Sequence, residues 1–555
     1  MSKRIFIGVA WPYANGPLHL GHVAGCYLPA DIFARYHRMR GNQVLMVSGS
    51  DSHGAPITMR AEAEGISARQ VVEKYHASFT DSWERLGITF DLFTTTMTEN
   101  HREVVHSIFA TLKERGYIYE DTSKVAYSPE FNRFLPDRYV TGTCPVCGFE
   151  EARGDQCDKC GSILDPVDLK DPAHVRGGKR YPIEIRDTPH LFFRLSAFNK
   201  QLLDWVRPQE HWRANVRNFT RGFLEKGLKD RAITRNLDWG LPVPQPGYED
   251  KRIYVWFEAV CGYLSASIEW AKAQGTPDAW KPFWEDRDTR AYYFIGKDNI
   301  PFHTIIWPAM LMGRGGLNLP YDVPANEYLG IEGRKLSTSR NWAVWLPDYL
   351  NRFAPDPLRY CLTAGMPESS DADFSWAEYV RRNNDELVAA FGNLAHRTLT
   401  QVHRNFNAQV PEPGPLGPDD EALLAAAEAA LAATGASIEA ARFREAIGHA
   451  MGLAREANRY LDAQAPWKQV KTDRAAAGRT LHTTLHVLTA LRAALYPFLP
   501  HATQRLHELL GGAGAVEAQG WEAQRPVPGT PLPEPTPLFT KLDDSIAEEM
   551  RAQLG

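Results

Sequence analysis

The segment Tyr13-Ala-Asn-Gly-Pro-Leu-His19-Leu-Gly21-His22 follows directly on the apolar run Arg4-Ile-Phe-Ile-Gly-Val-Ala10. An apolar run of this kind predicts a β-strand, and the spacing after the turn predicts a helix over residues 18–40 that ends before Gly41. The two histidines then lie in the first helical turn, where free N–H groups and the helix dipole attract anions. The glycine between them leaves room for a flat ring. These features suit a nucleotide phosphate beside an adenine; two ordinary polar residues at a helix start are the alternative.

Length and composition are those of an ordinary globular protein. The chain has 555 residues, 44% of them hydrophobic and 23% charged, which predicts about three domains. A net charge of −5 neither requires nor excludes nucleic acid. The first apolar run is too short for a signal-peptide core, and no uninterrupted apolar stretch reaches membrane-spanning length. Seven cysteines without an export signal do not suggest a disulfide framework. We expect a cytoplasmic protein with no membrane partner.

A second strand over residues 43–48 leads into the polar loop Gly49-Ser-Asp51-Ser-His53-Gly54, and helical patterns continue to about residue 115. Strand–helix–strand order predicts a right-handed parallel crossover, and ligands bind at the carboxyl ends of such strands. His19 and Asp51 both follow strands. They are therefore expected at one edge of a Rossmann-type α/β sheet.

The pattern becomes irregular and rich in proline and glycine between residues 117 and 230. Alternation then resumes, with a strand expected over 252–256, a helix to 272, a strand over 291–295 and a helix over 302–312. The simplest interpretation is one α/β sheet interrupted by an insertion; two adjacent α/β domains are the alternative.

The C-terminal part has a different composition. Residues 385–510 are rich in alanine and leucine at helical spacing, which predicts a helix bundle, and six prolines over 525–537 predict an extended strap. The predicted divisions are a first Rossmann half (1–116), an insertion with a zinc knuckle (117–230), a second Rossmann half (231–324), a linking region (325–384) and a helical domain with its strap (385–555).

Four cysteines form the strongest single motif. Cys144-x-x-Cys147 and Cys157-x-x-Cys160 are separated by nine residues, and a glycine follows each pair, at Gly148 and Gly161. Such turns allow four thiolates to converge on one Zn²⁺, and four thiolates leave no open position for catalysis. We therefore predict one structural zinc ion. A redox-active pair and chance clustering are the alternatives.

The stretch Ile331-Glu-Gly333-Arg-Lys335-Leu-Ser337-Thr338-Ser339-Arg340 combines a glycine, hydroxyl groups and three cations within ten residues. A loop of this composition can close over a polyphosphate. The alternative is a solvated basic loop.

Together, His19-Leu-Gly-His22 and Lys335-Leu-Ser-Thr-Ser339 resemble the His-Ile-Gly-His and Lys-Met-Ser-Lys-Ser signatures of class I aminoacyl-tRNA synthetases. Within that class the chain resembles the methionyl-tRNA synthetase family, from about residue 3 to residue 540. The insertion is too short for the editing domain of the isoleucine, valine and leucine relatives. The similar stretches are Trp11-Pro-Tyr-Ala-Asn-Gly, Asp51-Ser-His-Gly54, Tyr254-Val-Trp256-Phe-Glu-Ala259, Phe294-Ile-Gly-Lys-Asp298 with Phe302-His303, Asn393-Leu-Ala-His-Arg397 and Ala465-Pro-Trp467.

The resemblance implies two reactions: methionine and Mg²⁺-bound ATP give methionyl-adenylate, and the methionyl group then passes to the 3′ end of initiator or elongator methionine tRNA. The chain lacks the extra tRNA-binding module that dimerises some relatives, so a monomer is expected. The resemblance assigns catalysis to His19, His22 and Lys335; ATP binding to Gly21, Lys335, Ser337 and Thr338; methionine binding to Tyr13, Asp51, Trp256, Ala259, Val260, Tyr263 and His303; and anticodon binding to Asn393, Arg397, Pro466 and Trp467.

One signature position departs from the family. Thr338 stands where a second lysine is usual, so we expect Lys335 to carry more of the pyrophosphate charge.

Other predicted site residues also have purely structural interpretations. Asp51 could cap a helix, the aromatic residues of the pocket could belong to the core, and Trp467 could belong to the core of the bundle. Two other functions stay open: a different class I synthetase, or an adenylate-forming ligase descended from one; and a zinc-knuckle RNA-binding protein with a decayed nucleotide site.

Overall fold

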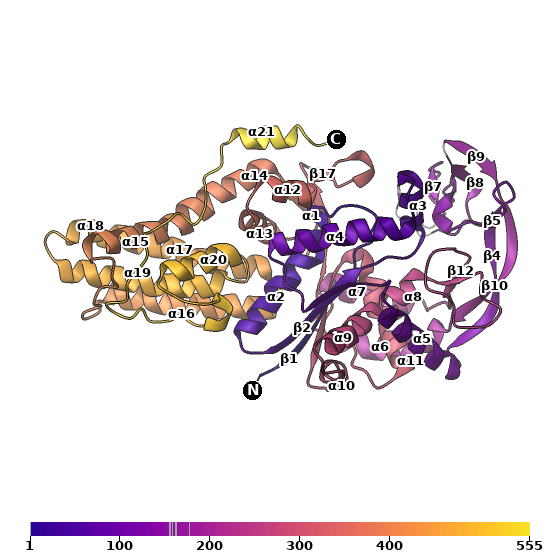
Figure 1. The fold of residues 1–555 in the computed structure, drawn as a ribbon, viewed down its shortest axis with the longest axis horizontal. Helices are drawn as coiled ribbons and strands as arrows, with labels where there is room; N and C mark the ends of the chain where they lie inside the picture. The colour runs from indigo at the N-terminus through magenta and orange to yellow at the C-terminus, as the bar shows by residue number, and fades with distance from the viewer. Residues whose placement is uncertain (1, 155–156, 158, 161, 163, 177) are drawn as a thin grey trace.

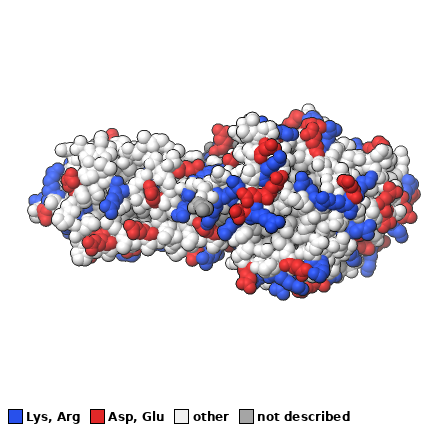
Figure 2. Space-filling view, turned by 90° about the horizontal axis from the view of Figure 1, so that it is seen from below, with Lys and Arg blue, Asp and Glu red and all other residues white. Residues whose placement is uncertain are grey.

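The protein is elongated in this computed structural model, which describes residues 2–154, 157, 159–160, 162, 164–176 and 178–555. The C-terminal helices form one end, the parallel sheet lies centrally, and the antiparallel strands of the insertion form the other end (Figure 1). Lys and Arg alternate with Asp and Glu over the face drawn in Figure 2, on which the narrow helical end is mostly uncharged.

One parallel sheet contains strands from both sides of the insertion, which confirms a single interrupted domain over two adjacent ones. Its order is β15-β14-β1-β2-β3 and every neighbouring pair is parallel. The central strand β1 is buried on both faces because helices cover them. The strands are β1 (Arg4–Val9), β2 (Gln43–Ser50), β3 (Leu92–Thr95), β14 (Arg290–Gly296) and β15 (Ala325–Asn326).

The helix predicted over residues 18–40 forms, but in three parts. The short helix α1 (Leu20–His22) passes into the π-helical turn η1 (Val23–Tyr27) and then into α2 (Leu28–Met39). Gly41, with φ +70°, ends the run as expected. The other helices around the sheet are α3 (Ala55–Glu64), α4 (Ala68–Leu86), α5 (Glu99–Glu114), α9 (Gly262–Ala273), α10 (Lys281–Glu285), the π-helical turn η5 (Phe302–Ile306) and α11 (Trp307–Arg314).

The insertion is more regular than its composition suggests. β4 (Ile118–Ser128) and β10 (Glu184–Phe193) pair antiparallel over ten residue pairs, and β5 (Arg133–Phe134) and β11 (Arg231–Ala232) extend that sheet. A second sheet, beside the cysteines, contains β6 (Val140–Thr143), β7 (Ala152–Arg153), β8 (Lys170–Arg176) and β9 (Lys179–Pro182), and the helices α6 (Asn199–Val206) and α7 (Ala214–Glu225) follow.

The strand expected over 252–256 is wrong beyond its first two residues. β13 (Arg252–Ile253) pairs antiparallel with β12 (Thr234–Arg235), outside the parallel sheet. The chain then turns into the helix α8 (Val255–Ala259). Aromatic and β-branched residues favoured a strand, but helical packing buries Val255, Phe257 and Glu258 together, and tertiary burial outweighs propensity.

The predicted helix bundle and strap are confirmed. The strap lies along the loop that precedes α16. Val410 N–H donates to Thr530 O at 3.0 Å, and Leu532 N–H donates to Ala408 O at 2.8 Å. The bundle contains the π-helical segment η7 (Arg382–Gly392), α15 (Asn393–Asn405), α16 (Pro418–Glu439), α17 (Phe443–Gln464), α18 (Pro466–Gln469), α19 (Arg474–Leu495) and α20 (Pro500–Leu509).

One described helix, α16, is long and apolar enough to cross a membrane by length and composition alone. It carries Glu421 and Glu428 and packs against α17 and α19. This composition therefore also fits a helix of the bundle.

A linking region joins sheet and bundle. It contains β16 (Leu329–Ile331), β17 (Arg334–Lys335), α12 (Leu346–Arg352), α13 (Pro355–Ala364), β18 (Ala372–Phe374) and α14 (Trp376–Arg381). Sequence patterns did not predict the last helix, α21 (Ser545–Arg551), which crosses from the bundle back to α14 (Figure 1). There Arg352 pairs with both carboxylate oxygens of Glu549.

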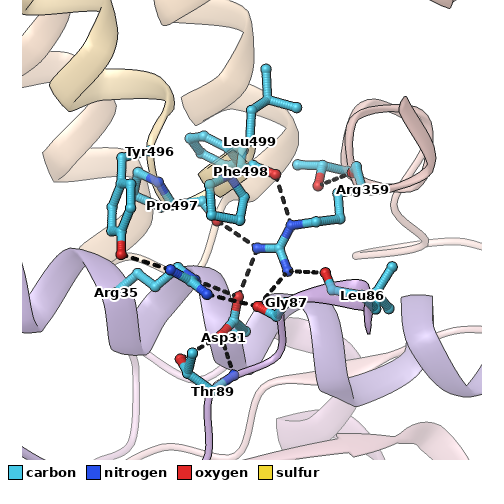
Figure 3. A network of polar contacts seen from close by, with 12 residues as sticks. Asp31, Arg35, Leu86, Gly87, Thr89, Arg359, Tyr496, Pro497, Phe498 and Leu499 are labelled. Carbon is cyan, nitrogen blue, oxygen red and sulfur yellow. Dashed lines mark hydrogen bonds and ion pairs between the residues drawn. The ribbon is translucent and has the colours of Figure 1, made fainter. Parts of the chain in front are cut away.

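A buried charge network holds the bundle against the sheet (Figure 3). Asp31 on α2 accepts bonds from Arg35 (2.8 Å), Arg359 of α13 (2.7 Å) and both Thr89 donors. Arg359 also donates to the carbonyls of Pro497 and Phe498, at the turn between α19 and α20. Burial alone would raise the pKa of Asp31, but the two arginines lower it to about 2.

Asp31→Asn should lower the free energy of unfolding by about 3–5 kcal/mol, because two buried guanidinium groups lose their counter-charge. Urea titration near neutral pH measures this. Asp286→Asn, which removes a partly exposed partner of Arg4, is the control and should cost less than about 1 kcal/mol. Equal losses in the two variants would contradict the importance of the network.

Candidate active site

The first signature lies where α1 begins, as predicted. His19 is the residue before the helix, and its backbone N–H donates to His22 Nδ1 at 3.2 Å. The two imidazole rings stack with their centroids 3.8 Å apart. They therefore form one paired surface at a helix N-terminus.

Both signature histidines are neutral near pH 7. Burial lowers the pKa of His22 to about 4, and burial together with the His22 ring lowers the pKa of His19 well below its usual value. Because His22 Nδ1 accepts a bond, its proton lies on Nε2. The rings can donate hydrogen bonds to a phosphate but do not supply full positive charges.

Gly21 is tightly packed on the side where a Cβ would lie. A Cβ there would lie 3.0 Å from His19 Nδ1 and 3.3 Å from Leu336 Cδ1, closer than ordinary contact allows. The glycine thus makes room for the His19 ring and for the basic loop.

The second signature lies against the first, although more than 300 residues separate them in the sequence. Leu20 N–H donates to Val344 O at 3.1 Å, and Leu346 N–H donates to Leu18 O at 2.8 Å. Two reciprocal bonds between Ser337 and Trp342, of 2.9 and 3.0 Å, close the loop. Backbone hydrogen bonds therefore bring the signature histidines and the basic loop together.

The cations of this loop are exposed. Lys335 Nζ lies 5.2 Å from the centroid of the Tyr328 ring, and the Arg334 guanidinium lies 4.5 Å from that of Trp342. Thr338, at the position of the missing lysine, begins a short 3₁₀ turn and is exposed. Its neutral hydroxyl leaves the positive charge of the loop to the flanking residues.

Tyr13 and Asp51 lie at the carboxyl edge of the sheet, where β1 and β2 end. Ala14 N–H donates to Asp51 O at 2.9 Å, and Asp51 N–H donates to Pro12 O at 2.8 Å. Asp51 is only 5% exposed. Burial and the charge of Glu258 raise the pKa of Asp51 well above its usual value, which is the expected state of a carboxyl that awaits a cation.

Predicted pocket residues from two other elements meet nearby. Tyr263 on α9 donates to His303 Nε2 at 2.6 Å, and His303 Nδ1–H donates to Asn299 O at 2.9 Å. Burial lowers the pKa of His303 to about 4, so its ring is neutral. Trp256 packs on Phe302 with ring centroids 3.6 Å apart. Val260 is buried and Ala259 half-buried on the same stretch of chain.

Trp11 belongs to this region, but pattern reasoning did not select it. A Cβ on Gly49 would lie 2.5 Å from the Trp11 ring and one on Gly262 2.8 Å from it. Trp11 Nε1 is buried and has no hydrogen-bond partner within the described residues. A glycine inside a strand, as at Gly49, signals close approach of another group and is the clue that could have found Trp11.

Glu258 was likewise missed. It is fully buried and pairs with His53, which follows β2. It lies within the similar stretch Tyr254–Ala259 but was not selected from it, because periodicity does not distinguish it from a core position.

The four predicted cysteine ligands converge. Their sulfur atoms all lie within 4.8 Å of one another, with Cys144 and Cys160 at 3.9 Å and Cys147 and Cys157 at 3.6 Å. Zn–S bonds of about 2.3 Å in a tetrahedron place sulfurs about 3.8 Å apart. The donor set therefore fits a metal ion. Gly148 has φ +73°, as the first turn requires, and Gly161 lies outside the described residues.

The predicted anticodon residues gather at the far tip of the bundle. The Arg397 guanidinium lies 5.0 Å from the centroid of the Trp467 ring and 2.6 Å from Asp462 Oδ1. Asn393 lies one helical turn before Arg397 on α15 and is exposed. Pro466, which is buried, begins α18 directly after Ala465, whose φ of +45° is strained for a residue with a side chain. The sharp turn leaves Trp467 half-buried beside Arg397.

Two known families match successive parts of the chain. Residues 5–399 match the family described as tRNA synthetases class I (M), and residues 410–555 match the anticodon binding domain of methionyl tRNA ligase. A methionine–tRNA ligase of Dehalococcoides mccartyi is 59% identical, covering 100% of both chains. One from Thermomicrobium roseum is 52% identical, covering 100% of this chain and 99% of the relative.

Solved structures agree. Mycobacterium tuberculosis methionyl-tRNA synthetase in complex with methionyl-adenylate has a TM-score of 0.81 at 28% identity, covering 97% of this chain and 99% of that one. Its apo form has a TM-score of 0.73 at 27% identity, covering 98% and 99%. The chain therefore belongs to the methionyl-tRNA synthetase family of class I tRNA synthetases.

Proposed function

We propose that this chain attaches methionine to initiator and elongator methionine tRNA in two steps, as a cytoplasmic monomer, with methionyl-adenylate as the intermediate. One observation carries the first step: backbone bonds hold the stacked His19 and His22 rings against the Lys335 loop, at the end of a parallel strand. The five predicted divisions of the chain and the site roles below belong to the same proposal.

In the first step the methionine carboxylate attacks the α-phosphorus of ATP, so no side-chain nucleophile is needed. Catalysis then consists of positioning and of stabilising the charge of the transition state. His19 and His22 donate hydrogen bonds to phosphate oxygens, and Gly21 admits the adenine. Lys335, Ser337 and Thr338 bind the departing pyrophosphate, which Mg²⁺ accompanies. Because Thr338 is neutral, Arg334 and Arg340 assist Lys335.

Methionine binds between the sheet edge and the aromatic residues. Asp51 receives the ammonium group, since a buried carboxylate is the natural partner of a cation there. Tyr13, Trp256, Ala259, Val260, Tyr263 and His303 enclose the thioether, because sulfur packs favourably against ring edges. A hydrogen-bonded Tyr263–His303 pair supports this assignment, because it fixes both rings as walls.

The tRNA anticodon binds at the tip of the bundle. Unstacked bases are recognised by stacking on aromatic rings and by hydrogen bonds to their edges. Trp467, which Pro466 and Arg397 hold in place, offers the ring, and Asn393 and Arg397 offer the donors.

One Zn²⁺ binds Cys144, Cys147, Cys157 and Cys160 as a structural ion. Four thiolates leave no coordination site for substrate. When bound, the ion supplies cross-links that hold the small second sheet of the insertion together.

His22→Ala should lower the rate of adenylate formation by about 100- to 1000-fold, because one preorganised donor to the transition state is lost. Methionine affinity should change by less than about threefold. Pre-steady-state adenylate formation and calorimetric titration with methionine measure the two quantities. His403→Ala, an exposed histidine of the bundle, is the control. Loss of methionine binding alone would refute the assigned role.

Trp467→Ala should reduce kcat/KM for tRNA charging by about 10- to 150-fold, since base stacking contributes about 1–3 kcal/mol. Methionine-dependent ATP–pyrophosphate exchange should be unchanged. Trp280→Ala, at the residue before α10 beside the parallel sheet, should alter neither measurement. Parallel losses of charging and exchange in the Trp467 variant would indicate a folding role for this residue instead.

The purified protein should contain about one zinc ion per chain by elemental analysis. Cys157→Ser should abolish that zinc and increase amide hydrogen exchange in β6–β9, since binding stabilises the folded site. Cys361→Ser, a cysteine of α13 far from the cluster in sequence, should retain the metal. A metal-free protein with protected β6–β9 amides would exclude the zinc site.

A further inference from the structure

A buried carboxylate with two histidine partners lies behind Asp51. Glu258 on α8 is fully buried. Its Oε1 lies 2.8 Å from His53 Nδ1, and its Oε2 lies 3.7 Å from His101 Nε2. His53 follows β2 and His101 lies on α5, so three separate segments converge on this one carboxylate. None of the three side chains has a role in the two steps described above.

His53 contacts both buried carboxyl groups. Its backbone N–H points at Asp51 Oδ1, 3.5 Å away, while its ring binds Glu258. His53 is 6% exposed, and little water screens the charges around it. Charges in such surroundings act strongly on one another. The charge of Glu258 therefore acts directly on Asp51, and the backbone N–H of His53 acts in the opposite sense.

The other ionisable groups around these carboxyls are mostly neutral near pH 7. Burial raises the pKa values of the Tyr13 and Tyr263 hydroxyls and of the Cys261 thiol well above their usual ranges. Arg138, from the insertion, acts on Tyr13, as does Tyr254. The ring of Trp239, 5.8 Å from that of His53, carries no charge.

Two carboxylates buried in one site repel each other, and a nearby cation is needed if both are to be ionised. Burial alone would raise the pKa of Glu258, but His53 and His101 lower it below its usual value. Burial and Glu258 together raise the pKa of Asp51. Glu258 is therefore the carboxylate that stays charged, and Asp51 is the one that responds to its surroundings.

We propose that His53 is a positioning residue for the methionine ammonium group: its ring holds Glu258 at 2.8 Å and its backbone N–H points at Asp51, so that it offsets the buried charge of Glu258 and lets Asp51 bind the ammonium. The inference depends on the role given to Asp51 above. It gives the His53–Glu258 pair a function in substrate binding, with His101 as a second, weaker partner of the same carboxylate.

The proposal requires opposite effects from two residues in direct contact. Removing the His53 ring takes its hydrogen bond away from Glu258, so the carboxylate charge acts more strongly on Asp51 and raises the pKa of Asp51 further. Removing Glu258 takes away the repulsion and lowers that pKa. If the pair were purely structural, the two variants would have effects in the same direction, because loss of either partner would weaken the same packing.

The test measures methionine-dependent ATP–pyrophosphate exchange from pH 5.5 to 9 in the full-length chain. His53→Gln should move the acidic limb of kcat/KM for methionine upward by about one pH unit. At pH 6.5 its KM for methionine should rise about tenfold, with kcat changed less than about threefold. Glu258→Gln should move the limb downward, and the double variant should return close to wild type. Calorimetric titration with methionine at pH 6.5 and 8.5 should give the same ranking, with weaker binding than wild type in the His53→Gln variant and none of this weakening in Glu258→Gln.

His37→Gln, a buried histidine of α2 bonded to Asn42, is the matched control and should not shift the profile. If His53→Gln does not fold, His101→Gln should still shift the limb upward, opposite to Glu258→Gln. Shifts in the same direction, or none, would overturn the proposal. Asp51→Asn separates this from the broader function: if methionine binding survives in that variant, Asp51 does not receive the ammonium and both ideas fail.

Discussion

The buried carboxylate of Asp31 is the interaction on which the arrangement of the two halves depends. It is matched by two guanidinium groups, and Arg359 extends the network to the turn between α19 and α20. Asp31 also lies on the helical run that begins with His19 and His22. The docking of the bundle and the geometry of the candidate ATP site therefore share one rigid element, with the signature histidines at one end and the network farther along.

Two π-helical turns lie beside this site. η1 follows His22 directly, and η5 carries His303; η1 also packs against β14. π-helical turns are rare and often occur at functional sites. In each case the irregular turn is immediately followed by a regular helix, α2 or α11, so the unusual geometry is confined to one short segment before each helix.

Local patterns predicted the parts of the fold that depend on local chemistry. The first strands, the helix stop at Gly41, the interrupted sheet, the bundle and the proline strap all follow from periodicity and turn residues. The cysteine spacing predicted a cluster whose sulfurs converge. The candidate site was found through motifs: His19 and His22 were visible because a helix start has a recognisable sequence, and Lys335 because a basic loop does.

What sequence reasoning missed depends on contacts across the chain. Residues 252–256 have strand-like composition, but the strand stops at Ile253 and packing makes Val255 and Trp256 part of the helix α8. Trp11 and Glu258 resemble core positions, and their setting is defined only by Gly49, Gly262 and the two histidines that converge there. The pairing of Leu18 and Leu20 with the chain after the basic loop is equally long-range, and no local rule specifies it.

The central claim is that this site activates methionine. The most direct measurement is ATP–pyrophosphate exchange with each of the twenty amino acids, run without tRNA. The account predicts exchange with methionine alone among them, and weaker exchange with norleucine, because replacing sulfur by a methylene changes binding by only about 1–3 kcal/mol. Robust exchange with a different amino acid, or none with methionine, would contradict it.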